Sequence, residues 1–398
     1  MVRISNRAAN ISPSATLSVD AMAKAMRKAG HDVIGFGAGE PDFETPLYIK
    51  EAAIAALDAG YTRYTPAGGI IELREAICNK MVADYQLAYE PDQVVISCGA
   101  KHSLYNLFQV ICDPGDEVIV MAPYWVSYVE QIKLADGVPV IAKTNDTITF
   151  QPELGAIRAA ITPRTKAIIV NSPSNPTGVV LKKEFLLALG KLAVENDLLV
   201  ISDEIYGKLV YGDAEHISFP SLVEEFKERT VLINGVSKTY AMTGWRIGYA
   251  AGPKEIIKAI CDLQSHSTSN PNSIAQQAAV AALVGPDDTV YQMREQFDRR
   301  RQYIVDRLNE IRGISCFRPE GAFYVFPNIS ELYGKAINGF VIKDSEGFAK
   351  SLLQEAQVAV VPGVAFGSND HVRLSYCLSL EEIRRGLDRI ADFVTRLE

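Results

Sequence analysis

Short runs rich in valine and isoleucine alternate with amphipathic stretches from about residue 47 to residue 280, which limits the chain to few architectures. The runs are almost continuously apolar, as in strands that are buried on both faces. The pattern predicts an α/β fold whose mostly parallel seven-stranded sheet is covered by helices. The expected strands span residues 93–99, 117–122, 138–143, 166–171, 198–203, 230–236 and 246–252, and the helices between them include 101–112, 124–136 and 183–196.

The pattern changes after about residue 285. A long charged helix is expected there, followed by short strands in S-C-F-R-P, A-F-Y-V-F-P, V-A-V-V-P-G and H-V-R-L-S-Y and a final helix from residue 380. Residues 1–46 are too few to fold alone. We therefore expect an N-terminal arm at 1–12, a smaller α+β domain built from 13–46 and 285–398, and a large domain at 47–284.

Composition excludes several classes of function. The net charge of −8 argues against a general nucleic-acid or membrane-surface binder, although a local phosphate site is compatible with it. The six cysteines are scattered without a C-x-x-C pair, and the N-terminus has no long apolar stretch, so we expect reduced thiols and a cytoplasmic protein. The five histidines show no ligand spacing, so no metal site is expected.

Polar and small residues follow several of the predicted strands. Ligands of such sheets bind beyond the carboxyl ends of the strands, so these residues are candidates for a site. They are Gly99-Ala100-Lys101, Asn175, Asp203 with Tyr206, and Ser237-Lys238.

Lys238 stands out among them. It lies among small and aromatic residues in S-K-T-Y-A-M-T-G-W-R, with Arg246 eight positions later. Desolvation and a nearby positive charge lower a lysine's pKa, as covalent catalysis by an amine requires. Taken alone, the same pattern also fits a structural lysine.

The other candidates are weaker by themselves. Asn175 lies in N-S-P-S-N-P-T-G, which fits a simple loop as well as an amide projecting into a site, and its bond to Pro176 could be cis. Asp203 either caps the following helix or pairs with a protonated ring nitrogen. Gly99 and its neighbours form either an ordinary turn or a phosphate site at a helix N-terminus.

Together and in this order, these motifs make the sequence resemble the class I aminotransferases of fold type I, which depend on pyridoxal 5′-phosphate (PLP). The resemblance runs from P-S-A-T at residue 13 to H-V-R-L-S-Y at residue 371. It is closest to the bacterial subgroup of aspartate aminotransferases that includes aspartate/prephenate aminotransferases.

The resemblance implies PLP as cofactor and a role for each matching residue. Lys238 would carry PLP as a Schiff base and transfer the proton, and Asp203 would pair with the ring nitrogen. Asn175 and Tyr206 would bond the ring hydroxyl, and Trp125 would stack on the ring. The other residues that would contact the cofactor, mainly its phosphate, are Gly99, Ala100, Lys101, Ser237 and Arg246. Tyr64 would reach the phosphate of the neighbouring subunit, which implies a homodimer.

Substrate recognition is also implied. Arg373, inside the apolar run V-R-L-S-Y, needs a partner and would pair with the substrate α-carboxylate near Gly39, within reach of Asn175 and Trp125. A structural salt bridge is the other interpretation of this arginine. Lys101 and Thr16 occupy the places that the subgroup uses for a second carboxylate. No arginine lies in residues 265–270, where other aspartate aminotransferases supply one, and we assign no role to residues 267–270.

The expected reaction is ping-pong transfer of an amino group from L-aspartate to 2-oxoglutarate, giving oxaloacetate and L-glutamate. Aspartate/prephenate or glutamate/prephenate transfer is an open alternative, because prephenate also has a second carboxylate. A β-lyase on the same fold is a further enzymatic alternative. The non-enzymatic alternative is a PLP-fold ligand-sensing module of a transcription regulator, against which the acidic balance argues.

Overall fold

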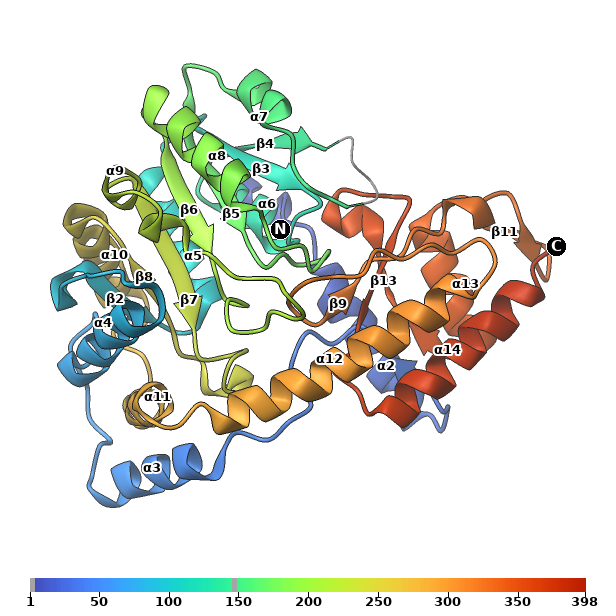
Figure 1. Cartoon of the computed structure of the whole chain (residues 1–398), viewed down its shortest axis with the longest axis horizontal. Helices are drawn as coiled ribbons and strands as arrows, with labels where there is room; N and C mark the ends of the chain where they lie inside the picture. The colour runs from blue at the N-terminus through green and yellow to red at the C-terminus, as the bar shows by residue number, and fades with distance from the viewer. Residues whose placement is uncertain (1–3, 145–148) are drawn as a thin grey trace.

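The computed structural model describes residues 4–144 and 149–398, and a seven-stranded sheet forms its centre (Figure 1). The strands are β2 (Val94–Ser97), β3 (Glu117–Ala122), β4 (Val138–Lys143), β5 (Thr165–Asn171), β6 (Leu199–Asp203), β7 (Thr230–Gly235) and β8 (Gly248–Ala251). Their order is β2-β8-β7-β6-β5-β3-β4, and only β8 runs antiparallel to its neighbours. The predicted mostly parallel sheet is confirmed.

Helices cover both faces of this sheet. In β3, Val118 and Val120 pack in one apolar cluster with helices of one face, while Ile119 packs in another cluster on the opposite face. Side chains of a strand alternate between faces, so a strand covered on both sides must be apolar at every position. The first face carries α5 (Ala100–Ile111), α6 (Ser127–Leu134) and α10 (Lys254–Ser267), and the second carries α7 (Leu154–Ala160), α8 (Lys183–Glu195) and α9 (Glu224–Lys227).

Further helices pack at the β2 edge of the sheet. α4 (Ile71–Tyr85) and α11 (Ser273–Val284) bury their apolar residues against β2 and β8, and α3 (Leu47–Asp58) packs on α11. Seen in Figure 1, α3 lies at the outer edge of the molecule.

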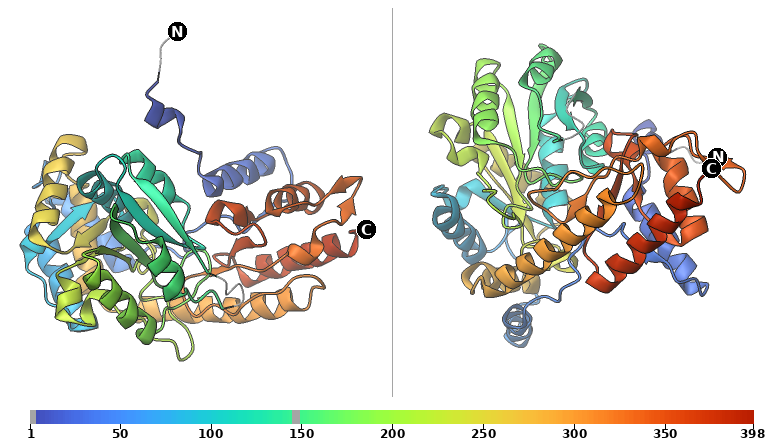
Figure 2. Two further views of the ribbon diagram at one scale, coloured as in Figure 1. Left: turned by 90° about the horizontal axis from the view of Figure 1, so that it is seen from above. Right: turned by 45° about the vertical axis from the view of Figure 1, so that its right-hand side comes forward.

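The C-terminal segments form a second unit together with the N-terminal ones. β1 (Ile34–Gly35) pairs in parallel with β12 (Val358–Ala359), and α2 (Ala15–Lys28) lies beside the C-terminal elements (Figure 2). The short α1 (Asn6–Ala9) precedes α2. The other elements of this unit are β9 (Tyr324–Val325), β10 (Ala336–Ile337), β11 (Phe340–Val341), β13 (Val361–Pro362), β14 (Val372–Ser375), α12 (Asp288–Asn309), α13 (Ser345–Ala356) and α14 (Leu380–Thr395).

One predicted strand is wrong. The segment S-C-F-R-P at residues 315–319 makes only an isolated bridge between Ser315 and Asn328. The side chain of Asn309 explains this, because its amide accepts from the Cys316 N–H at 2.8 Å and donates to the Cys316 carbonyl at 3.0 Å. The backbone groups that a strand would use are therefore already bonded to a side chain.

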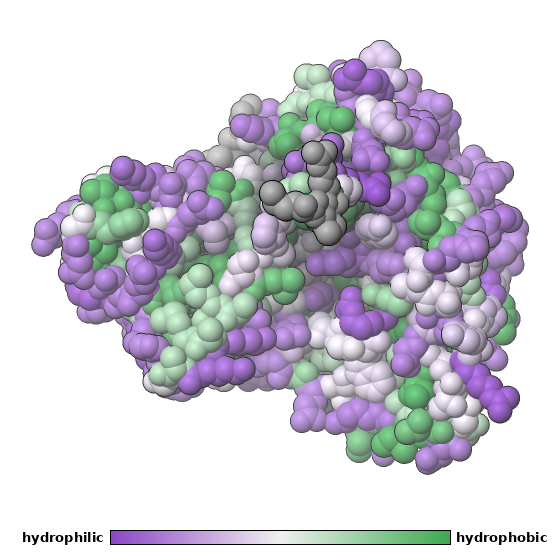
Figure 3. Space-filling view, turned by 180° about the vertical axis from the view of Figure 1, so that it is seen from behind, coloured by the Kyte–Doolittle hydropathy of each residue, from purple (hydrophilic) through white to green (hydrophobic). Residues whose placement is uncertain are grey.

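The surface mixes hydrophilic and hydrophobic residues, as the face in Figure 3 shows. Over the described ranges, no helix has the length and apolar character needed to cross a membrane. All six cysteines are free. Within the same ranges, no group of three histidine, cysteine or acidic side chains is arranged to hold a metal ion.

Candidate active site

A cavity of about 430 Å³ opens at the carboxyl ends of the central strands. The sheet, α2 and residues 38–40 line it together with β14. All the predicted site residues except Gly99 and Tyr64 belong to its lining: Thr16, Gly39, Ala100, Lys101, Trp125, Asn175, Asp203, Tyr206, Ser237, Lys238, Arg246 and Arg373. Residues that are far apart in the sequence therefore meet at one place.

Lys238 follows β7 and is partly buried in this cavity. Its Nζ donates a hydrogen bond to the Gly39 carbonyl at 2.6 Å and lies 5.7 Å from the centre of the Phe323 ring. Burial lowers the pKa of Lys238 to about 8, despite the opposing effects of Cys377 and Glu40. About a tenth of this amine is therefore neutral at pH 7, far more than of an ordinary lysine, and the neutral form is what a nucleophile or proton acceptor requires.

Asp203 ends β6 and is buried beneath the cavity, with 4% of its surface exposed. The Tyr128 hydroxyl donates to Oδ2 at 2.6 Å, and the Ile205 N–H donates to Oδ1 at 3.3 Å. Burial raises the pKa of Asp203 to about 6, although both hydrogen bonds oppose the rise. A cationic partner would stabilise this carboxylate in its ionised form.

Arg373 on β14 is the largest fully buried side chain of the described residues. Its Nη1 donates to Asn175 Oδ1 at 3.0 Å and its Nη2 donates to the Gly37 carbonyl at 2.9 Å, while Nε is buried without a partner. In residues 4–144 and 149–398, no carboxylate forms a salt bridge with it. The salt-bridge interpretation of Arg373 is therefore wrong, and a buried guanidinium remains able to bind an anion.

Two tyrosines close the cavity beside Arg373. The hydroxyls of Tyr206 and Tyr324 are 2.9 Å apart, and both side chains are buried. The Tyr324 ring lies 4.5 Å from the Arg373 guanidinium. Burial raises the pKa of Tyr206 well above its usual value, so its hydroxyl stays protonated and can donate a hydrogen bond.

Gly99 lies behind the cavity wall, at the point where β2 leads into α5. Its φ is +90°, and a Cβ here would lie 2.3 Å from Arg246 Nη2, so only glycine fits. No described side chain caps the N-terminus of α5, which leaves the N–H groups of Ala100 and Lys101 available for an anion. Arg246 donates to the carbonyls of Thr243 and Cys98, at 2.8 and 3.2 Å, and Ser237 also lines the cavity. The donors are suited to a phosphate group.

Lys101 and Thr16 lie at another part of the lining. Lys101 Nζ lies 4.9 Å from the centre of the Trp125 ring, and burial is the main cause that lowers its pKa. Trp125 in turn contacts Tyr128 edge to face, at 5.3 Å between ring centres. The Thr16 hydroxyl is buried without a partner. These groups offer a cation and a free hydroxyl donor to a ligand.

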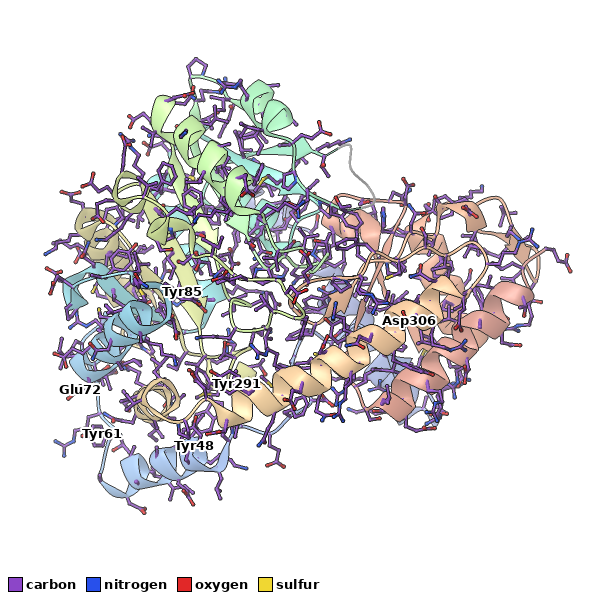
Figure 4. The ribbon with its side chains drawn as sticks, viewed as in Figure 1. Tyr48, Tyr61, Glu72, Tyr85, Tyr291 and Asp306 are labelled. Atoms are coloured by element: carbon purple, nitrogen blue, oxygen red, sulfur yellow. The ribbon has the colours of Figure 1, made fainter. Side chains whose placement is uncertain are left out.

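Tyr64 does not reach the cavity of its own chain. It follows α3, and 89% of its surface is exposed. Figure 4 labels Tyr61 in the same segment, at the outer edge of the molecule beside α3.

The whole chain has close relatives. Residues 31–390 match the family model described as "Aminotransferase class I and II". The chain belongs to this family. The aspartate aminotransferase of Geobacillus stearothermophilus is 53% identical over 99% of both chains, and the aspartate/prephenate aminotransferase of Cereibacter sphaeroides is 47% identical over 100% of both. The structure of the Thermus thermophilus aspartate aminotransferase with maleate superimposes with a TM-score of 0.93 at 46% identity, covering 98% of this chain and 100% of that one.

Family membership confirms the predicted fold and shows that the protein is an aminotransferase that uses PLP. The ligand-sensing alternative is therefore wrong. The site fits the cofactor. Asp203 is a buried carboxylate that forms no ion pair with any described residue, which suits a protonated pyridine nitrogen, and the α5 N-terminus beside Arg246 suits a phosphate. The Asn175-Pro176 bond is cis.

Three residues that hold the aminotransferase site together were not predicted. Tyr128 bonds Asp203, and its position one helical turn after Trp125 is a signal that could have revealed it. Asn171 accepts from the Asn175 N–H at 2.8 Å and donates to the Asp203 carbonyl at 3.0 Å, and it ends a predicted strand. Tyr324 comes from the second unit, and nothing in its local sequence points to the site.

Proposed function

We propose that this enzyme is an aspartate aminotransferase. The observation that carries the proposal is that two cations without a carboxylate partner in the described ranges, Arg373 and Lys101, line the same cavity as Lys238. A dicarboxylic amino acid has complementary charges at its two ends, so one end suits Arg373 and the other suits Lys101 and Thr16.

The comparisons support the same substrate class. Relatives about half identical to this chain are named aspartate aminotransferases, and the solved Thermus thermophilus enzyme has maleate, itself a dicarboxylate. Other relatives are named aspartate/prephenate aminotransferases, so transfer to prephenate is a second candidate activity. Prephenate also has two carboxylates for the same two cations. A β-lyase has no such support.

Each site residue is proposed to act on a stated group. PLP, when bound, supplies an electron-withdrawing ring that tolerates the electron pair left by the α-proton. Lys238 accepts that proton on Nζ and returns it, and Asp203 holds the charge of the ring nitrogen. Arg373 orients the α-carboxylate, with the backbone of Gly39 beside it.

The remaining contacts hold the cofactor. Ser237, Arg246 and the backbone N–H groups of Ala100 and Lys101 bind its phosphate. Gly99 has no side chain, which lets Arg246 lie close to the backbone at the start of α5. Asn175 and Tyr206 donate to the ring hydroxyl. The bond from Arg373 to Asn175 Oδ1 leaves the Asn175 amide NH₂ free for this purpose. Trp125 packs on the ring face.

The experiment that tests the substrate mixes the PLP-loaded enzyme separately with aspartate, glutamate, alanine, phenylalanine and arogenate, and follows the cofactor absorbance. We expect rapid conversion by the two acidic donors and little by alanine. Lys101→Gln is expected to lower kcat/KM for aspartate about 10- to 100-fold and to change that for alanine little, because only aspartate has a second carboxylate.

The matched control for the Lys101 variant is Lys258→Gln, which changes an exposed lysine paired with Asp262. Equal activity with alanine and aspartate would overturn the dicarboxylate assignment. Rapid reaction with arogenate would establish the second candidate activity. Release of ammonia and pyruvate would indicate a β-lyase.

We also propose a homodimer with shared sites, in which Tyr64 reaches the phosphate of the partner subunit. The exposure of Tyr64 supports this, and so do Leu47, Ile54 and Leu57, which are at least half exposed on one face of α3. Figure 4 shows Tyr48 and Tyr61 at the two ends of α3. Light scattering is expected to give twice the chain mass of 43.6 kDa. A monomer that transaminates at full rate would contradict the shared site.

We also propose the domain boundaries and the cellular location. The contacts of α2 and β1 with C-terminal elements support a small domain built from residues 13–46 and 285–398, with the large domain at 47–284 and an arm at 1–12. Free cysteines throughout the chain support a cytoplasmic location.

A further inference from the structure

Residues 37–45, which we call the strap, connect β1 to α3 and pass along the cavity. They form no helix or strand. Among the described residues, they also make no backbone–backbone hydrogen bond. Phe36, the residue before the strap, still has one, because its N–H donates to the Ala359 carbonyl. Side chains must therefore keep the strap in place.

Three cations from distant parts of the chain hold residues 37–42 of the strap. Arg373 binds the Gly37 carbonyl at 2.9 Å, and Lys238 binds the Gly39 carbonyl at 2.6 Å. The third cation is Arg300, which binds Asp42 through two bonds of 2.6 and 2.9 Å. At the far end of the strap, Lys50 pairs with the exposed Glu44 at 2.7 Å, and hydroxyl contacts at Glu40 and Thr45 add to these bonds.

Arg300 differs from the other two cations in position. It lies on α12 between the labelled Tyr291 and Asp306 (Figure 4), and neither Arg300 nor Asp42 lines the cavity. Its guanidinium lies 5.1 Å from the ring centre of Phe43 and 5.6 Å from that of Phe297, and its side chain is only 11% exposed. Asp42 is more exposed, but the bidentate geometry and the rings around the guanidinium make this pair stronger than one between two exposed side chains.

The first two contacts change when the site is filled. On the proposed function, Lys238 engages the cofactor and Arg373 engages the α-carboxylate, so the bonds to Gly39 and Gly37 are lost or shared. The bond from Arg300 is outside the cavity and is not affected. We propose that Arg300 and Asp42 form a positioning clamp that holds the strap over the loaded site.

The clamp matters because Gly39 borders the place of the α-carboxylate. A Cβ at Gly39 would lie 2.6 Å from the Tyr324 hydroxyl, so the strap fits closely against the wall that Tyr324 shares with Arg373. A displaced strap would open this side of the site to water. Arg300 touches neither substrate nor cofactor, so its loss should weaken substrate binding more than it slows the chemical step.

The test uses Arg300→Met and Asp42→Asn in the full-length protein, with Arg299→Met as matched control. Arg299 is the neighbouring, exposed residue of the same helix. Asp42→Asn keeps the shape of an exposed residue, which provides a variant that folds if Arg300→Met does not. Hydrogen exchange of the strap amides is measured in the free protein and with PLP and maleate, alongside KM and kcat for aspartate.

In the loaded protein we expect strap exchange about tenfold faster in both variants than in the control, but less than about threefold faster in the free protein. KM for aspartate should rise about tenfold, with kcat within about threefold. The double variant should be no worse than the stronger single variant, because both remove one interaction.

Equal acceleration of exchange in the free and loaded states would overturn the clamp, since a merely structural pair would act in both. An unchanged KM would also overturn it. If the wild-type enzyme turned over no dicarboxylic donor, the proposed function would fail instead. Hydrogen exchange of the strap amides would then be compared in protein loaded with PLP alone, since PLP already removes Lys238 from Gly39. Faster exchange in the variants than in the control would still support the clamp, and equal exchange would overturn it.

Discussion

Lys238→Ala is expected to lower kcat for transamination of aspartate by at least about 10⁴-fold. The variant loses the group that accepts and returns the α-proton, and nearby Tyr206 and Tyr324 cannot replace it because burial holds the pKa of both hydroxyls above the usual value. Single-turnover absorbance measurements with the loaded enzyme and aspartate provide the rate. They separate the chemical step from product release.

PLP should still bind to the Lys238 variant, because Arg246, Ser237 and the α5 N-terminus are unchanged. Gel filtration followed by an absorbance spectrum checks this point. Lys254→Ala, which changes an exposed lysine paired with Asp92, is the control and should keep wild-type rates. A Lys238→Ala enzyme with normal transamination would disprove the assigned proton carrier.

Asp203→Asn is expected to have opposite effects on the free and the loaded protein. Burial raises the pKa of Asp203 to about 6 in the folded protein, above its ordinary value of 3.8. Between these values the unfolded chain releases its proton while the folded protein keeps it, so this group lowers the free energy of unfolding as pH rises from 4 to 6. The loss is about 3 kcal/mol above pH 6. Free Asp203→Asn protein should therefore be more stable than wild type at pH 8, by up to that amount.

In the loaded enzyme the carboxylate faces a cationic ring nitrogen, and an amide cannot supply the charge. Removing one partner of a buried ion pair costs about 2–5 kcal/mol. We therefore expect kcat/KM for aspartate to fall about 30- to 4,000-fold, with weaker PLP binding. Urea unfolding at pH 5 and pH 8, with and without PLP, measures both effects.

The single amide oxygen of Asp203→Asn can accept from the Tyr128 hydroxyl but not also from the Ile205 N–H, so the variant removes the charge and keeps one of the two hydrogen bonds. Asp213→Asn, at an exposed position, is the control and should show neither effect. A free variant less stable than wild type at pH 8 would contradict a carboxylate destabilised by burial.

Much of the central sheet was predictable from the sequence, because strands covered on both faces must be apolar throughout. The expected strand at 93–99 ends earlier, at Ser97, since Gly99 adopts a positive φ and starts the turn into α5. The strand expected at 315–319 does not form, because the Asn309 side chain binds the backbone of Cys316. Such a contact leaves no periodic pattern in the sequence.

The sequence by itself predicted that a lysine, an acid and a glycine turn, each at the end of an apolar strand, lie at one edge of a mostly parallel sheet, and its resemblance to class I aminotransferases implied their chemistry. Only the tertiary structure decided what surrounds them. It buries Asp203 against Tyr128, leaves Arg373 without an acidic partner in the described ranges and brings Arg300 of α12 into contact with Asp42 of the strap. These features depend on contacts between distant segments. The pKa of a charged group depends on its burial in those contacts, and no local sequence pattern encodes that burial.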